Sequence, residues 1–269
     1  MEFRPLGKTD EKVPVIGMGT WTMGNQASGN DRSTEIEALR RGIELGMVLI
    51  DTAEAYGYGK AEGLVAEAVA GRRDEVLIAT KVSPEHFHYD DVLMSCDSSL
   101  QRLGIKQIDL YQLHWPNPRV PIRESMRAME QLVNQGKIRY IGVSNFSAEQ
   151  TMEAQESLSK NEVVSNQVQY SLTSRSIERS LFPYCEREKI TIIAYSPLDR
   201  GKIPGRIPKR ITEKYGMSPA QVMLNWVTYK DSVVAIPKAA SVGHIEENSR
   251  SVTPRLSAED YALLSKLFS

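Results

Sequence analysis

The sequence predicts an α/β protein that folds as a closed parallel (β/α)8 TIM barrel with a short N-terminal β-hairpin. Eight short apolar runs alternate with helical patterns along the 269 residues, and no segment rich in Pro, Gly or Ser interrupts the alternation. Strand-helix-strand units are right-handed, and eight of them can close on themselves within about 250 residues. We therefore expect one barrel domain over residues 1–269.

The expected strands are short apolar runs with β-branched residues, a pattern that is typical of buried strands. Two brief extended pieces at 3–6 and 12–14 predict the hairpin. The barrel strands are then expected at 15–19, 48–51, 76–81, 107–113, 138–143, 163–168, 190–195 and 233–236.

The segments between these strands carry apolar residues at helical spacing and end at a glycine, which is a common helix stop. Clear cases are 35–43, 90–103 and 122–135, which end before Gly46, Gly104 and Gly136. Ser218 and Pro219 open a further helix, because proline is favoured at the first helical position.

Composition excludes several partners. Lys plus Arg (33) nearly balance Asp plus Glu (34) without long runs of like charge, so neither nucleic acid nor an anionic membrane surface is expected. Cys96 and Cys185 lie far apart without a metal-like spacing, which favours reduced thiols. No stretch approaches the ~18 apolar residues of a membrane span. We expect a cytoplasmic protein with small-molecule partners; its oligomeric state stays open, a monomer included.

Polar residues follow seven of the predicted strands. These residues are Asp51, Lys81, His114, Ser144 with Asn145, Gln167, Tyr195 and Lys238. The carboxyl ends of parallel barrel strands carry the active site, so these side chains are expected to form one ring there. Asp or Asn after a strand can instead cap a helix. For Asp51 and Asn145, helix capping therefore stays open as an alternative to a role in the active site.

An acid, a phenol, an amine and an imidazole suit the reduction of a carbonyl group. Hydride transfer places negative charge on the carbonyl oxygen, which a proton must relieve. Tyr56 would donate this proton, with its pKa lowered by the Lys81 ammonium. Asp51 would hold Lys81 charged, and His114 would donate its N–H to the carbonyl oxygen.

These four residues resemble the catalytic tetrad of the aldo-keto reductases. The resembling motifs cover nearly the whole chain: IDTAEAYG at 50–57, TKV at 80–82, LHWP at 113–116, GVSNF at 142–146, NQVQY at 166–170 and AYSPL at 194–198. The chain is identified as a short, prokaryotic-type member of that family. The resemblance implies an NAD(P)H-dependent reductase of aldehydes or ketones.

The tetrad carries no hydride, so a nicotinamide cofactor is implied. The dinucleotide fingerprint is missing, since Gly17 and Gly19 are followed by Thr22 where a third glycine belongs. We interpret both as loop glycines. By resemblance, Ser144, Asn145 and Gln167 hold the carboxamide, Tyr195 stacks on the nicotinamide, Ser196 and Leu198 line the pyrophosphate, and Glu247 and Asn248 grip adenine.

Lys238 resembles the entry to the adenosine phosphate site of the family. NADPH-preferring members commonly follow this lysine with Ser and place Arg six residues after it, where this chain has Ala239 and His244. A charged hydrogen bond is worth roughly 1.5 to 3 kcal/mol, so the preference for the phosphate is weakened. Arg200, in the loop after Tyr195, is a candidate to replace the lost phosphate contacts. NADP(H) is the expected cofactor and NAD(H) the alternative.

Three other functions are alternatives to a carbonyl reductase. His86 and His88 form an H-x-H pair, as in metal-dependent barrel hydrolases. The pair follows Pro84 in a loop, so we expect no metal site. Residues 142–146 lack the last glycine of a nucleophile elbow, which disfavours an acyl hydrolase. A cofactor-binding redox sensor with slow turnover stays open.

Aromatic residues are expected at the mouth of the pocket. Trp21 and Trp115 are the predicted substrate-binding residues, with Tyr56, Phe87 and Tyr89 as further candidates for lining or for core packing. The chain stops at Ser269, soon after the last predicted helix. A long C-terminal loop is therefore not expected, and a wide pocket for assorted aldehydes and ketones is.

Overall fold

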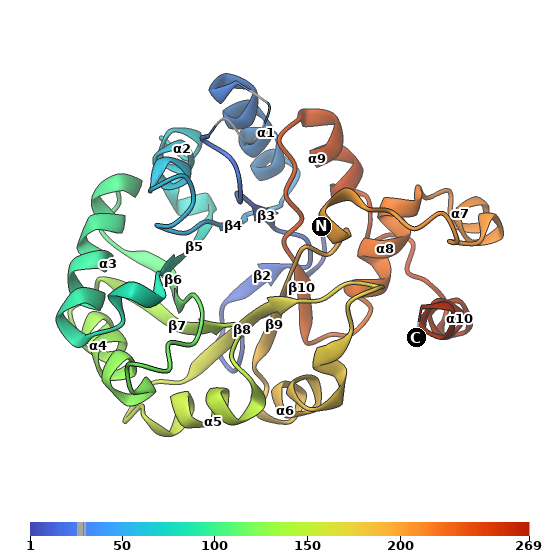
Figure 1. Ribbon diagram of the computed structural model, residues 1–269. Coiled ribbons are helices and arrows are strands. Elements are labelled where there is room, and N and C mark those ends of the chain that lie inside the picture. Colours follow the sequence, from blue (N-terminus) through green and yellow to red (C-terminus); the bar gives the residue numbers. More distant parts are fainter. Residues whose placement is uncertain (26–28, 30, 269) are drawn as a thin grey trace.

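The computed structural model describes residues 1–25, 29 and 31–268. Its centre is an eight-stranded parallel sheet in which each strand pairs with the next along the chain, from β3 to β10 (Figure 1). The strands are β3 (Met18–Gly19), β4 (Leu49–Asp51), β5 (Leu77–Val82), β6 (Ile108–Leu113), β7 (Ile138–Ser144), β8 (Val163–Gln169), β9 (Thr191–Tyr195) and β10 (Val233–Ala235). All eight overlap the runs that the sequence predicts.

The first and last strands of the sheet meet. Ile16 forms a parallel bridge with Ala235, and Gly19 forms one with Lys238. The N–H of Ala235 donates to the carbonyl of Val15 at 2.9 Å. The sheet therefore curls round on itself, as is consistent with the predicted (β/α)8 barrel.

Gly17 and Gly19 are not loop glycines, contrary to the interpretation from sequence. A Cβ at Gly17 would lie 2.7 Å from the carbonyl oxygen of Leu49, and one at Gly19 would lie 2.8 Å from that of Ile236. Gly19 belongs to β3 and Gly17 directly precedes it. The two glycines permit a close approach of neighbouring strands, which explains the G-x-G pattern without a phosphate loop.

Helices surround the sheet (Figure 1). They are α1 (Arg32–Glu44), α2 (Lys60–Ala68), α3 (Tyr89–Leu103), α4 (Ile122–Asn134), α5 (Ala148–Glu156), α6 (Leu181–Glu188), α7 (Lys209–Tyr215), α8 (Pro219–Val227), α9 (Val242–Ser249) and α10 (Ala258–Leu267). The four helices predicted from sequence are confirmed as α1, α3, α4 and α8. The side chain of Ser218 caps α8 and Pro219 is its first residue.

The predicted hairpin is confirmed as the antiparallel pair β1 (Phe3–Pro5) and β2 (Lys12–Pro14). Val13 from β2 and Leu6 from the turn are fully buried. They pack in one cluster with strand residues such as Leu49 and Leu110. The hairpin thus completes a core inside the sheet, and a second, larger cluster fills the layer between the sheet and the helices.

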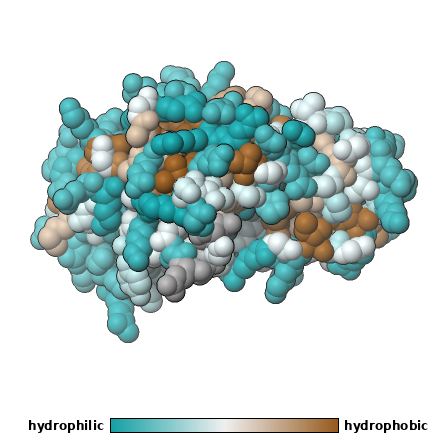
Figure 2. All heavy atoms as spheres, turned by 90° about the horizontal axis from the view of Figure 1, so that it is seen from above, coloured by the Kyte–Doolittle hydropathy of each residue, from teal (hydrophilic) through white to brown (hydrophobic). Residues whose placement is uncertain are grey.

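The face of the molecule in Figure 2 is covered mainly by hydrophilic residues, with hydrophobic ones in small separate groups. Among the described residues, no helix is long and apolar enough to cross a membrane. Cys96 and Cys185 are both buried and unpaired.

Candidate active site

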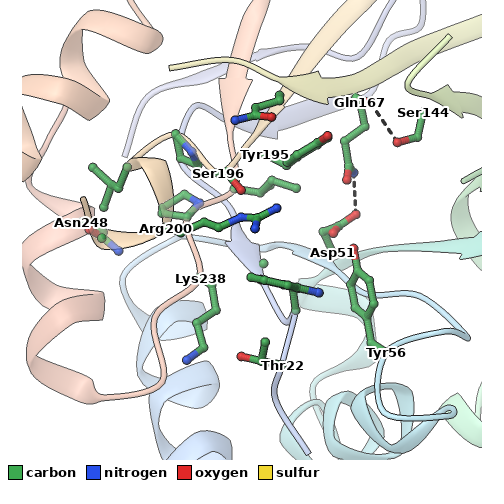
Figure 3. A pocket seen from close by; sticks show the side chains of 18 of the residues that line it. Thr22, Asp51, Tyr56, Ser144, Gln167, Tyr195, Ser196, Arg200, Lys238 and Asn248 are labelled. Carbon is green, nitrogen blue, oxygen red and sulfur yellow. Dashed lines mark hydrogen bonds between the residues drawn. The ribbon is translucent and has the colours of Figure 1, made fainter. Parts of the chain in front are cut away.

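A cavity of about 940 Å³ opens at the carboxyl ends of the strands, within the range of small-molecule sites. The predicted site residues that line it are Trp21, Asp51, Tyr56, His114, Trp115, Ser144, Asn145, Gln167, Tyr195, Ser196, Leu198, Arg200, Lys238, His244, Glu247 and Asn248. Figure 3 shows Asp51, Tyr56 and Gln167 toward one end, Asn248 toward the other and Arg200 between them.

Lys81 lies at the centre of the tetrad, on β5, and is fully buried. Its Nζ donates to Oδ2 of Asp51 at 2.8 Å and to the carbonyl of Thr52 at 2.8 Å. The same nitrogen is 3.2 Å from the hydroxyl of Tyr56. Lys81 therefore connects the acid at the end of β4 to the phenol in the turn that follows.

Burial and charge act in opposite directions on these groups. Burial alone would lower the pKa of Lys81, but the adjacent Asp51 carboxylate, with Tyr56, raises it above its usual value. The lysine is therefore a cation. Burial raises the pKa of Tyr56, and the Lys81 ammonium opposes this only in part. The expected lowering of the Tyr56 pKa is therefore wrong for this structure, because desolvation of the phenolate outweighs the cation.

His114 directly follows β6 and lies edge-on to the ring of Tyr56, with ring centroids 5.7 Å apart. Burial and the nearby Lys81 ammonium lower the pKa of His114 to about 3. The imidazole is therefore neutral near pH 7 and can donate one N–H. The two aromatic walls beside it, Trp21 and Trp115, are 47% and 48% exposed, so they are open to a ligand.

The polar side chains next to the tetrad bond to one another. Nε2 of Gln167 donates to Oδ1 of Asp51 at 2.7 Å, and the Ser144 hydroxyl donates to the carbonyl of Gln167 (Figure 3). Nδ2 of Asn145 donates to the carbonyl of His114 at 3.1 Å, and the Tyr195 hydroxyl donates to Oδ1 of Asn145 at 2.9 Å. The cavity wall is thus continuous with the tetrad.

Neither Asp51 nor Asn145 caps a helix. The cap of α2 is Gly59 and the cap of α5 is Ser147. Asn145 has a left-handed backbone, with φ of 62°, which asparagine tolerates better than most residues. Its side chain is thereby free to bond within the cavity wall instead.

The far part of the cavity carries exposed cations. Lys238 and Arg200 are both exposed, and the Arg200 guanidinium lies over the Trp21 ring at 5.0 Å from its centroid. His244 is exposed on α9 and lines the same cavity, whereas Ala239 is buried. This part of the cavity therefore has the charge that a phosphate-bearing ligand requires.

Two of the aromatic residues proposed for the mouth lie elsewhere. Phe87 is 2% exposed and packs in the core, and Tyr89 lines a separate surface hollow with Arg127. Sequence reasoning in turn missed Thr22 and Ile203, which do line the cavity. Neither residue belongs to a recognisable motif, so no sequence signal marks it.

His86 and His88 do not share a ligand. Nδ1 of His86 is 2.9 Å from Glu54, and Nδ1 of His88 is 3.0 Å from Glu124. Within the described residues, no three His, Cys, Asp or Glu side chains are grouped to hold a metal ion. The geometry of this pair gives the metal hydrolase alternative no support.

A parallel α/β barrel-type sheet with a lysine-linked phenol beside a neutral imidazole defines a class of proteins that can protonate a developing oxyanion. The sequence model of the aldo/keto reductase family matches residues 15–268. The chain belongs to the aldo/keto reductase family.

Similar proteins agree with this assignment. The chain is 40% identical to methylglyoxal reductase YeaE of Escherichia coli, over 96% of this chain and 92% of that protein. Among solved structures, the aldo-keto reductase Tm1743 in complex with epalrestat has a TM-score of 0.94 at 39% identity, covering 99% and 100% of the two chains. An aldo-keto reductase from Klebsiella pneumoniae in complex with NADPH has a TM-score of 0.89 at 38% identity, covering 100% and 96%.

Proposed function

We propose that this protein reduces aldehydes or ketones to alcohols with NADPH, and that Tyr56 donates the proton. The observation that carries the proposal is the position of Lys81 Nζ, 2.8 Å from Asp51 and 3.2 Å from the Tyr56 hydroxyl, beside a neutral His114. The raised pKa of Tyr56 keeps the phenol protonated, as a proton donor must be before reaction.

Each member of the tetrad then has one task. The His114 N–H orients the carbonyl oxygen of the substrate and stabilises charge on it. Tyr56 gives its proton to that oxygen, and Lys81 stabilises the resulting phenolate, since a cation favours it. Asp51 holds the ammonium in place. General acid catalysis of this kind is typically worth ~10² to 10⁴ in rate.

NADPH fits the cavity and would supply the hydride when bound. Nε2 of Gln167 is already used by Asp51, so the amide oxygen remains to accept from a carboxamide. Ser144 and Asn145 complete that part, and the Tyr195 ring offers a stacking surface. The remaining contacts are assigned to Ser196, Leu198, Arg200, Lys238, His244, Glu247 and Asn248, which all line the cavity.

The proposed preference is for NADPH, with NADH as a weaker alternative. Lys238 and Arg200 supply positive charge to a 2′-phosphate, while Ala239 and His244 replace stronger partners. Solved relatives bound to NADP and NADPH support this order.

The proposed substrates are small carbonyl compounds, with 2-oxoaldehydes first. The relatives named methylglyoxal reductase and glyoxal reductase, the latter from Bacillus subtilis at 33% identity, support that class. Trp21 and Trp115 would form the walls of the substrate site.

The proposed fold is a single closed barrel over residues 1–269. The two parallel bridges between the first and last strands support closure.

The direct test of function is oxidation of NADPH in the presence of methylglyoxal, glyoxal and a panel of aromatic and aliphatic aldehydes and ketones. The proposal fails if no carbonyl compound in the panel accelerates NADPH oxidation.

The sharpest variant for this test is Tyr56→Phe, which removes only the proton donor. We expect aldehyde reduction to fall by at least ~10² with the dissociation constant for NADPH nearly unchanged. Steady-state kinetics and fluorescence titration measure the two quantities. A variant with more than a third of the wild-type rate would remove Tyr56 from its proposed role.

A further inference from the structure

The carboxylate of Glu54 joins the segment that carries Tyr56 to the strand that carries Lys81. Glu54 lies in the turn after β4, and its side chain is only 9% exposed. Its Oε1 accepts a hydrogen bond from the backbone N–H of Ser83 at 2.7 Å and lies 2.9 Å from Nδ1 of His86. Ser83 directly follows β5, so this carboxylate links the two segments that meet in the tetrad.

Arg102 on α3 adds a second link. Its Nη2 lies 3.9 Å from Oε2 of Glu54, and its Nε donates to Oε2 of Glu62 at 2.5 Å. Glu62 is fully buried in α2, and its other oxygen accepts from the Thr80 hydroxyl at 2.6 Å. Thr80 directly precedes the tetrad lysine. Arg102 therefore contacts two carboxylates, one on each side of Tyr56 in the sequence, and each carboxylate bonds to β5 or its end.

Gly59 shows how closely the arginine lies under this turn. A Cβ at Gly59 would be 2.5 Å from Cδ of Arg102, and the glycine has φ of 83°, a conformation that side chains disfavour. Arg102 therefore packs directly against the backbone between Tyr56 and α2. Buried charges require partners. Both carboxylates, those of Glu54 and Glu62, lie within ion-pair distance of Arg102.

We propose that Glu54 is a positioning residue for proton transfer, and that together with Arg102 and Glu62 it holds the Tyr56 hydroxyl at its distance from Lys81. We call the side chains of Glu54, Arg102 and Glu62 the Arg102 bracket. This inference rests on the proposed function for the role of Tyr56. A displacement of about 1 Å at a reacting group can cost 10²-fold in rate, so loss of these contacts should lower the rate of proton transfer.

The test replaces the carboxylate while keeping its approximate shape. Glu54→Leu should lower kcat by about tenfold or more with NADPH affinity within about twofold. The bracket bonds to the end of β5 and to the strand residue before Lys81, and its three side chains are not among those that line the cofactor cavity. Glu54→Gln keeps an oxygen that can accept from Ser83, and should retain most of the rate. Should Glu54→Leu not fold, Glu54→Asp, whose carboxylate is one methylene short of Ser83, replaces it with the same expectation.

Glu124→Leu is the matched control. Oε1 of Glu124 accepts from the backbone N–H of Tyr89 at 3.1 Å and lies 3.0 Å from Nδ1 of His88, so it makes the same pair of contacts away from the tetrad. This variant should keep the wild-type kcat. In a Tyr56→Phe background, Glu54→Leu should cause no further loss, since the bracket acts through the phenol.

A readout without turnover separates this proposal from the proposed function. In NMR spectra of ring-labelled tyrosine, with Tyr56 assigned from Tyr56→Phe, the Tyr56 resonance should move in Glu54→Leu and stay in Glu124→Leu. An unmoved resonance, a kcat above half of wild type, or a full-sized loss in the Tyr56→Phe background overturns the positioning role. A wild type without carbonyl turnover overturns the proposed function alone.

Discussion

At the scale of single residues, the balance of burial and neighbouring charge sets the charge states of Lys81, His114 and Tyr56. Lys81 is a buried cation because Asp51 is beside it, and His114 is neutral because burial and the nearby Lys81 ammonium both disfavour its charged form. The Tyr56 hydroxyl stays protonated because burial raises its pKa more than the Lys81 ammonium lowers it. None of these states follows from residue type alone, which is why the sequence predicted the residues of the tetrad but the wrong direction for the pKa of Tyr56.

The neutral state of His114 makes the stability of the protein depend on pH. Its pKa is about 3 in the folded protein, against about 6.5 for a free imidazole. The unfolded chain therefore binds more protons in this window, and the free energy of unfolding should decrease as pH falls from about 6.5 toward 3. Urea unfolding at a series of pH values should show a flatter dependence for His114→Gln. Equal slopes would contradict a neutral His114 in the folded protein.

His244 provides a residue-scale test of cofactor preference. A guanidinium offers a charged, forked donor to a phosphate where an imidazole offers a single N–H. His244→Arg should tighten NADPH by about tenfold and leave NADH almost unaffected, since only NADPH carries the 2′-phosphate. Fluorescence titration with both cofactors measures this. Unchanged NADPH affinity would show that residue 244 does not contact the phosphate.

At the scale of elements, two helices begin with the same capping box. Ser218 caps α8 and Ser147 caps α5, each through a glutamine three residues later. Only Ser218 also bonds to a residue of the cavity wall, since its hydroxyl donates to Glu247 at 2.5 Å. Substitutions of Ser218 and Ser147 can therefore distinguish an effect on helix stability from an effect on cofactor binding.

Ser218→Ala and Ser147→Ala should each lower the free energy of unfolding by about 1 kcal/mol, the usual cost of a lost N-cap. NADPH affinity should weaken in Ser218→Ala alone, because Glu247 then loses its partner. Chemical unfolding and cofactor titration of both variants check this. If the two serine variants bind NADPH equally well, Glu247 does not contribute to the cofactor site.

Elements were the most predictable part of this chain. Each barrel strand is an apolar run with β-branched residues, and Pro219 marks a helix start on its own. The G-x-G at residue 17 was harder. Local sequence does not show that the backbones of Leu49 in β4 and of Ile236, just after β10, approach these glycines, so the pattern alone favours a loop.

At the scale of the whole molecule, a ligand of the native state must stabilise it. If NADPH is the cofactor, saturating NADPH should raise the melting temperature in a concentration-dependent way, since 100 times the dissociation constant corresponds to about 2.7 kcal/mol. NADH should shift it less at equal concentration. A chelator should leave the melting temperature unchanged. No shift at millimolar NADPH or NADH would contradict a nicotinamide site.

The cavity was predictable only in part, because it depends on contacts between distant segments. The positions of Asp51, Lys81 and His114 at the carboxyl ends of three consecutive strands were sufficient to predict that they meet. The exclusion of Phe87 from the mouth, and the linking of Glu54 to Arg102, depend on how helices pack against the sheet. No local pattern encodes such packing.

The bonds among Gln167, Ser144, Asn145 and Tyr195 have a consequence for the entropy of binding. These side chains form hydrogen bonds to one another and to the backbone, and these bonds require no ligand. Their rotamers are therefore restricted during folding, and a ligand need not restrict them again, which spares about 0.5 to 1.5 kcal/mol for each mobile side chain. Replacing any of them removes a contact to the ligand and also frees the neighbouring side chains, so affinity and rigidity in this region change together.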